Sequence, residues 1–102
     1  MDKIDKNNIS INNIDIVLFL ENCYKNNLKI DIGHLNILIS LLNSENYISG
    51  EYLKKIINRD SRGAVHNRIN DLKQIGFNIK SKPGTFGGYY IESIPPWFKL
   101  KK

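Results

Sequence analysis

The stretch "SRGAVHNRINDLKQIGFNIK" (61–80) decides the fold, because its hydrophobic period changes part-way along. Its first part places apolar side chains at helical spacing, namely Val65, Ile69 and Leu72. Ser61 is a good N-cap, and Gly76 stands where a glycine commonly ends a helix. From residue 77 apolar and polar residues alternate, which is the period of a β-strand. The sequence therefore predicts a helix over 61–76 that leads directly into a strand.

The residues that follow indicate a β-hairpin. Two β-prone runs, "FNIKSK" (77–82) and "YYIES" (89–93), are separated by a segment rich in proline and glycine. Alternation points Ile79 and Ile91 towards the core, and it places Lys80, Lys82 and Tyr90 on the outer face. The glycines are not those of a phosphate-binding P-loop, because that motif needs a following helix and a Lys-Ser/Thr pair.

Upstream, three further apolar patterns predict helices. The first covers about 12–26, with Asn12 or Asn13 as its cap and a strand over 14–20 as the alternative. After a connector, the second covers 34–44, and the third covers 50–57 behind a capping Ser49. The run "YIS" (47–49) is too short to form a strand alone, but it could pair with a later one.

Length and charge limit the classes of function. The 102 residues suit one domain, and the longest apolar runs are far shorter than the roughly 20 residues of a membrane span. The single Cys23 and the polar N-terminus favour a cytoplasmic protein. Residues 1–50 carry four lysines against six acidic side chains, whereas residues 51–102 carry eleven Lys/Arg against four. This asymmetry indicates a polyanionic partner for the C-terminal half, with a solvated basic face as the plainer reading.

Three segments resemble the winged helix-turn-helix of the biotin-repressor type: "ISGEYL" (48–53), "SRGAVHNRINDLKQIGFNI" (61–79) and "PG" followed by "GYYI" (83–84 and 88–91). The resemblance implies an α+β fold with a three-helix core and a two- to three-stranded β-wing, here with an extra N-terminal helix. Two features depart from the family pattern. Gly63 replaces a good helix former, and the wing is longer.

This layout divides the chain into three parts. We expect a flexible N-terminus over 1–10, a single winged-helix domain over 11–94 and a basic C-terminal tail over 95–102. Within the domain, 11–30 would form the N-terminal helix and connector, 34–76 the helical core and 77–93 the wing. The wide apolar stripe of the N-terminal helix suggests that it contacts a second copy of the chain.

The resemblance implies DNA as the partner, and helical periodicity places candidate contacts on the face opposite the core. On the helix these are Ser61, Arg62, Gly63, His66, Asn67, Arg68, Asn70 and Lys73. On the wing they are Lys80, Lys82, Thr85, Phe86, Gly87 and Tyr90. Amides and an imidazole suit base edges, and cations suit phosphates. Phe86 would either enter the minor groove or fold back onto the neighbouring tyrosines.

No constellation typical of an enzyme is visible. Cys23, His34 and His66 lie far apart in the sequence, so we expect no metal and no cofactor. His34, at a helix start, is interpreted as a cap or surface residue. The sequence thus predicts a sequence-specific double-stranded DNA-binding protein without an effector domain, active as a homodimer or within a larger nucleoprotein complex. It would be a small regulator or, given the AT-rich codons of its abundant Asn, Ile and Lys, a plasmid or phage accessory factor. A protein-interaction module is the alternative.

Overall fold

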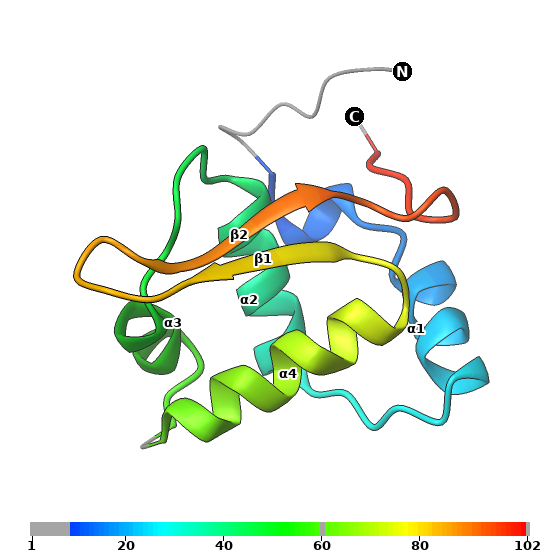
Figure 1. Cartoon of the computed structure of the whole chain (residues 1–102). Helices are drawn as coiled ribbons and strands as arrows, with labels where there is room; N and C mark the ends of the chain where they lie inside the picture. Colours follow the sequence, from blue (N-terminus) through cyan, green and yellow to red (C-terminus); the bar gives the residue numbers. More distant parts are fainter. Residues whose placement is uncertain (1–8, 60, 102) are drawn as a thin grey trace.

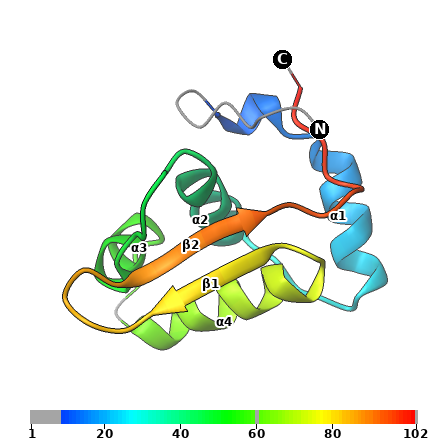
Figure 2. The same ribbon diagram turned by 45° about the horizontal axis from the view of Figure 1, so that its top comes forward.

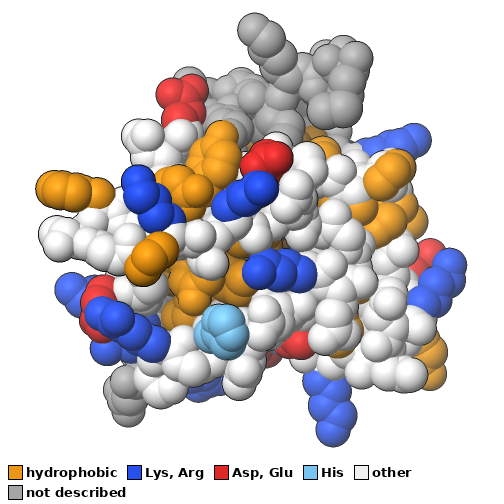
Figure 3. Space-filling model, in the orientation of Figure 1, with side chains coloured by type: hydrophobic (Ala, Val, Ile, Leu, Met, Phe, Trp, Pro, Cys, Tyr) orange, Lys and Arg blue, Asp and Glu red, His pale blue; other side chains and the backbone are white. Residues whose placement is uncertain are grey.

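The structure is a computed structural model that describes residues 9–59 and 61–101 (Figure 1). Its elements, in chain order, are a 3-10 turn η1 (Ile11–Asn13), α1 (Ile16–Lys25), α2 (Ile32–Leu42), α3 (Gly50–Ile56), α4 (Arg62–Gln74), β1 (Asn78–Lys82) and β2 (Gly88–Ser93). Helix α4 runs beneath the hairpin from the wing-tip end towards α1, as Figure 1 and Figure 2 both show. The face shared by α4 and the hairpin is shown as a surface in Figure 3.

The wing has the predicted two- to three-stranded form. Strands β1 and β2 pair antiparallel, with Ile79 opposite Ile91 and Lys80 opposite Tyr90. Ile48 adds a single residue of a third strand, an isolated antiparallel bridge to β2, because its N–H and C=O both bond the backbone of Tyr89 at 2.8 Å. The run at 47–49 therefore pairs with a later strand, as its sequence allowed. The α+β winged-helix architecture is confirmed.

Short polar side chains cap the helices. Ser49 accepts a hydrogen bond from the N–H of Tyr52, and Ser61 accepts one from Ala64, as predicted. The cap predicted for the first helix was wrong. Asp15 caps α1, because Asn13 instead belongs to η1 and bonds the backbone of Ser10. The second helix also begins earlier than predicted, since Asp31 accepts from the N–H of His34.

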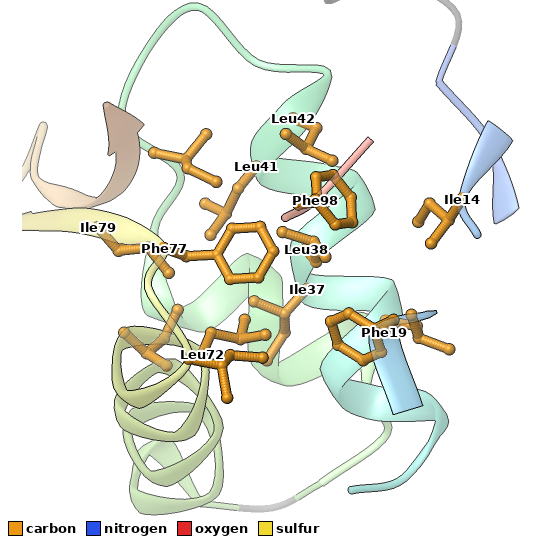
Figure 4. Close-up of a cluster of buried hydrophobic side chains, with 14 of the residues drawn as sticks. Ile14, Phe19, Ile37, Leu38, Leu41, Leu42, Leu72, Phe77, Ile79 and Phe98 are labelled. Carbon is orange, nitrogen blue, oxygen red and sulfur yellow. The ribbon is translucent and has the colours of Figure 1, made fainter. Parts of the chain in front are cut away.

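One hydrophobic core joins the helices to the hairpin (Figure 4). Helix α2 lies at its centre and contributes buried side chains from most of its circumference, which explains why its apolar pattern is nearly continuous. The predicted apolar face of α4 is buried, with Val65, Ile69 and Leu72 each at most 1% exposed. Ile79 and Ile91 point inward from the wing, as alternation predicted. The core thereby sets the orientation of α4 and the hairpin relative to each other.

The C-terminal segment differs from the tail that the sequence suggested, because it packs into the fold. Phe98 is buried, and its ring lies 5.0 Å from that of Phe77 in an edge-on contact. Trp97 donates from Nε1 to the carbonyl of Ile75 at 2.9 Å, which satisfies the end of α4. The backbone N–H of Lys101 then bonds the carbonyl of Asn13 beside η1. The two prolines end regular secondary structure, but burial of the aromatic rings still holds the segment against the domain.

Helix α1 buries only part of its apolar surface. Phe19 and Cys23 enter the core, whereas Val17, Leu20 and Tyr24 are exposed. These three residues are spaced so that they share one side of the helix. Both ribbon views place α1 at the opposite end of the molecule from the wing tip (Figure 2). Most of the N-terminal stretch predicted to be flexible, residues 1–8, lies outside the described residues, while Ile9 is buried.

Candidate nucleic-acid interface

The solvent face of α4 is entirely free of exposed aliphatic side chains. Its exposed residues are Arg62, Gly63, His66, Asn67, Lys73 and Gln74, while Asn70 is half-buried. Ser61 is also exposed, but its hydroxyl is used as the helix cap. The structure therefore brings most of the predicted helix contacts onto one side of α4, next to the wing.

The N-terminus of α4 is tied to α3 by an exposed ion-pair cluster. Arg62 Nε lies 2.8 Å from Glu51 Oε1, and Lys54 Nζ lies 3.1 Å from Glu51 Oε2. The hydrogen bond from Arg62, followed by that from Lys54, lowers the pKa of Glu51. Because this cluster is open to water, its ion pairs hold Arg62 only weakly, and a phosphate could replace the carboxylate.

The wing carries its polar side chains on the outer face. Lys80 lies 3.5 Å from Glu92 of the neighbouring strand. Lys82 Nζ lies 5.8 Å from the ring centre of Tyr47, whose ring in turn lies 5.6 Å from that of Tyr90. The ring of Tyr47 thus packs next to two of the predicted DNA contacts, Lys82 and Tyr90. Figure 3 shows Lys and Arg side chains spread over the face of the hairpin and α4.

A groove of about 560 Å³ separates the wing from the N-terminal ends of α3 and α4. Its walls combine backbone of the wing turn with Ser49, Glu51, Arg62, Lys82 and Thr85. Glycine at position 88 is required here, because a Cβ atom would lie 2.0 Å from the carbonyl oxygen of Ile48. The two cations and the serine and threonine hydroxyls in this groove suit a phosphate-bearing strand.

The wing turn presents two of its predicted contacts to solvent and withholds a third. Thr85 is exposed, and Phe86 is 89% exposed, so its ring does not fold back onto the tyrosines. Gly87 is buried, and its N–H donates to the carbonyl of Gly84 at 3.1 Å. The amide of Gly87 is therefore committed to the turn, while Thr85 and Phe86 lie at its apex.

Arg68 differs most from its predicted role. Its side chain is only 14% exposed, its guanidinium pairs with both carboxylate oxygens of Asp31, and it also donates to the carbonyl of Ala64. The hydrogen bond from Arg68 is the main reason that the pKa of Asp31 lies well below its usual range. Arg68 therefore joins α4 to the start of α2 through an internal ion pair, and its guanidinium is not available for DNA contact as predicted.

His34 belongs to the same internal cluster and is not a surface residue. It is 3% exposed, its Nδ1 accepts from the N–H of Asp31 at 3.0 Å, and its Nε2 lies 2.7 Å from Asp71 Oδ2. The sequence offered two roles for His34, a cap or a surface residue. The geometry agrees with the capping role, and the surface role was wrong. Residues 34 and 71 are distant in sequence, so no local signal could reveal this contact.

Sequence reasoning also missed two residues that shape the interface, Tyr47 and Glu51. Tyr47 comes next to the third strand, which is recognisable only once its partner is known. Glu51 lies in the "ISGEYL" stretch, but an acidic residue gives no sign of DNA contact until its cationic partners are seen. Within the part of the chain that the structure describes, no group of three or more His, Cys, Asp or Glu side chains is arranged to hold a metal ion. None of the described helices is long and apolar enough to cross a membrane.

Comparison with known families agrees with this geometry. The sequence profile of the HTH domain matches residues 34–90, which is more than half of the chain. The chain belongs to the helix-turn-helix family. In this helix-turn-helix domain, α3 and α4 form the paired helices, and the match continues into β2 of the wing. The domain identifies DNA as the partner of this fold, and α1 and the C-terminal segment are additions that lie outside the match.

A relative shares more than the helix-turn-helix domain. An uncharacterized protein of Methanocaldococcus jannaschii, MJ1005, is 43% identical over 123 residues, an alignment that covers 92% of this chain and 94% of the relative. Because that alignment extends beyond residues 34–90, the similarity includes segments that flank the helix-turn-helix domain. No solved structure matched the chain.

Proposed function

We propose that this helix-turn-helix protein binds double-stranded DNA sequence-specifically. The N-terminal half of α4 would read base edges in the major groove, with His66 and Asn67 as the principal contacts and Asn70 beside them. The wing would contact the adjoining backbone through Lys80, Lys82 and Thr85. Arg62 and Lys73 would bind phosphates at the two margins of the helix, and the N-terminus of α4 around Ser61 and Gly63 would lie close to the backbone.

The observation that carries this proposal is the composition of one continuous face. Every exposed side chain of α4 is polar or charged, and the groove beside it contains Arg62 and Lys82. A protein-interaction surface would be expected to place apolar or aromatic side chains at its centre, and the exposed face of α4 has none.

Selection of bound duplexes from a random library, followed by affinity measurements over a salt series, tests the proposal. The double variant His66→Ala/Asn67→Ala should lose discrimination between the selected site and a scrambled one by about 1–3 kcal/mol for each base contact removed. It should leave the salt dependence unchanged, because neither side chain is expected to bind phosphate. Lys82→Ala should weaken binding to both duplexes and reduce the slope of log K against log salt by about 0.9.

Lys25→Ala is the matched control, because it removes an exposed lysine from α1 at the other end of the molecule. It should change the salt slope little. Failure of the wild-type protein to bind any duplex at low salt would overturn the proposal. Equal affinity for selected and scrambled duplexes would overturn its specificity and favour the protein-interaction module.

We further propose a homodimer formed through α1. Its exposed strip of Val17, Leu20 and Tyr24 lies away from the wing, so two copies joined there would keep both DNA-binding faces free. A two-fold dimer would bind half-sites about one helical turn apart. Val17→Glu should convert the wild-type dimer to a monomer in analytical ultracentrifugation, whereas Tyr52→Ala on α3 should not. A monomeric wild-type protein would contradict this part of the proposal.

The biological role follows from the location of the bound site. A small transcriptional regulator would occupy promoters. An accessory factor of a plasmid or phage would instead join a larger nucleoprotein complex at an origin of transfer, a partition site or a replication site. Genome-wide mapping of the bound protein in its native host separates these roles. Binding confined to promoters would exclude the accessory role.

A further inference from the structure

Among the large hydrophobic side chains of the described residues, the phenyl ring of Phe86 is the most exposed. It is 89% exposed at the wing tip, where a lysine or a serine would be better solvated. The other rings of phenylalanine and tryptophan, those of Phe19, Phe77, Trp97 and Phe98, are packed against one another at the opposite end of the hairpin. A single exposed apolar side chain is common on protein surfaces, so the case for a partner rests on where this ring is held and on what surrounds it.

The backbone holds this ring on a well-defined support. Phe86 occupies the third position of a tight turn that is closed by the N–H of Gly87 and the carbonyl of Gly84. A Cβ atom on Gly87 would lie 2.0 Å from the carbonyl oxygen of Lys82, so the two sides of the turn are in close contact. Just behind the turn, Ile48 pairs with Tyr89 and fixes the wing to the domain. Little conformational freedom would remain to be lost when the ring is inserted.

The surroundings of Phe86 indicate which partner it meets. The groove directly behind the tip is lined by Lys82 and Thr85 of the wing and reaches α4 at Arg62, which is paired there with Glu51. With the N-terminal half of α4 in the major groove, the wing turn on the other side of this protein groove would meet the DNA beside it, where the minor groove lies.

We propose that Phe86 is a wedge that enters the minor groove and separates two stacked base pairs. This inference rests on the proposed function and adds a deformation of the DNA to it. Apolar wedges of this kind bend duplexes by about 20–90° towards the major groove, which here would be the groove that holds α4. Flexible pyrimidine–purine steps are the cheapest to open, so the wing would prefer TA or CA/TG steps without a hydrogen bond to any base.

A lipid surface is the other environment that accepts an exposed phenyl ring next to lysines. We favour DNA because even a myristoyl chain gives only marginal membrane binding, and one ring buries less apolar area. The residues on either side of the ring, Thr85 and Gly87, also line the groove that reaches Arg62 of the helix-turn-helix domain, whereas nothing in that arrangement serves a bilayer.

The test uses the full-length protein and an A·T-rich duplex of about three helical turns, with dyes at both ends and 2-aminopurine in its central TA steps. Low salt ensures occupancy that is independent of sequence. Wild-type protein should raise energy transfer between the ends and raise 2-aminopurine fluorescence, since the ends approach and a base unstacks. Phe86→Ala should abolish both signals at saturation and weaken binding about 10-fold, with an unchanged salt slope.

Two matched variants isolate the ring. Phe86→Leu should restore both signals in part, because leucine also acts as a wedge. Lys82→Ala should lower affinity and the salt slope but leave the bend of the saturated complex intact. Because the Phe86 side chain is exposed, Phe86→Ala should leave the fold and its thermal unfolding temperature unchanged.

The outcomes separate the two proposals. Failure of the wild-type protein to bind the duplex overturns the proposed function together with the wedge. Saturated complexes of Phe86→Ala that bend and unstack the duplex as wild type does overturn the wedge alone. Binding to phosphatidylserine vesicles that Phe86→Ala removes, with DNA bending unaltered, would assign the ring to a lipid surface.

Discussion

The two ends of α4 belong to the same helix but have opposite surroundings. At its C-terminal end, Trp97 bonds the carbonyl of Ile75, and a Cβ atom on the adjoining Gly76 would lie 2.7 Å from Pro95. At its N-terminal end, His66 and Asn67 face solvent, and Arg62 is held only by an exposed carboxylate. The C-terminal end is packed against apolar side chains. The N-terminal end carries polar side chains that face solvent.

This difference shows how a small domain presents a polar helix to a partner. Aromatic residues outside the helix-turn-helix domain contribute to the stability of the fold. The polar residues near the wing are therefore not needed for that stability. Phenylalanine illustrates the contrast, because Phe98 is buried among other rings while Phe86 is exposed. Between the ends, the pair of Arg68 and Asp31 ties the middle of α4 to α2.

Phe98→Ala should have the largest effect, a loss of about 3–5 kcal/mol in the free energy of unfolding, because it empties a buried site between Phe77 and Trp97. Urea denaturation followed by circular dichroism measures it. Phe86→Ala is the matched control and should change stability by less than about 0.5 kcal/mol. Equal effects of the two substitutions would remove the contrast between the two ends.

Gly88→Ala should come next, with a loss of about 3 kcal/mol, and should act on the wing end. The residue has φ +136°, and its new Cβ would collide with the carbonyl of Ile48. Hydrogen exchange at the N–H groups of Ile48 and Tyr89 should become faster, because their mutual bonds are broken.

Gly84→Ala is the control for that substitution. Gly84 also has a positive φ, but a Cβ atom there would meet nothing within 4 Å. Gly84→Ala should therefore cost only the backbone strain of a positive φ, and it should leave the hydrogen-exchange rate of the Ile48 N–H unchanged. If both alanines gave the same result, contact with the third strand would contribute nothing to the wing.

Asp31→Asn should have the smallest effect, a loss of about 1–3 kcal/mol near neutral pH, because it leaves Arg68 without its anionic partner. The pKa of Asp31 is lowered in the folded state, chiefly by the hydrogen bond from Arg68. Its contribution is therefore present above the unfolded-state pKa of about 3.9, and it is lost as the pH falls further towards the folded-state pKa.

Urea unfolding between neutral and strongly acidic pH measures this dependence. The wild-type curve should fall more steeply below about pH 4 than that of Asp31→Asn. Glu45→Gln, which removes an exposed carboxylate in a loop, should retain the wild-type steepness. Parallel curves for wild type and Asp31→Asn would show that the cluster does not join α4 to α2 in solution.

Much of the fold could be predicted because its signals are local. The period of Val65, Ile69 and Leu72, the caps Ser49 and Ser61, and the alternation about Ile79 and Ile91 each involve neighbours in the chain. The same periods place the polar face of α4, so most of its proposed contacts follow from the sequence. Whether these side chains bind DNA stays a prediction until it is measured.

The exceptions all depend on contacts between distant residues. Arg68 has the spacing of a surface residue on α4, but the start of α2 brings Asp31 to it. The residues after Pro96 are basic and follow two prolines, as in a disordered tail. Trp97 and Phe98 nevertheless pack against the hydrophobic core, which exists only once the helices have assembled. Asn13 matches the pattern of a cap for α1, but it turns back to Ser10 and bonds Lys101.

The sequence by itself determined the order of helices and strands, the face that α4 turns to solvent and the turn at the wing tip, because hydrophobic period and cap chemistry act over a few residues. Only the tertiary structure decided which polar side chains remain available. It buried His34, paired Arg68 internally and left Phe86 exposed. Burial and pairing depend on which elements meet, and that is set by the packing of the whole core.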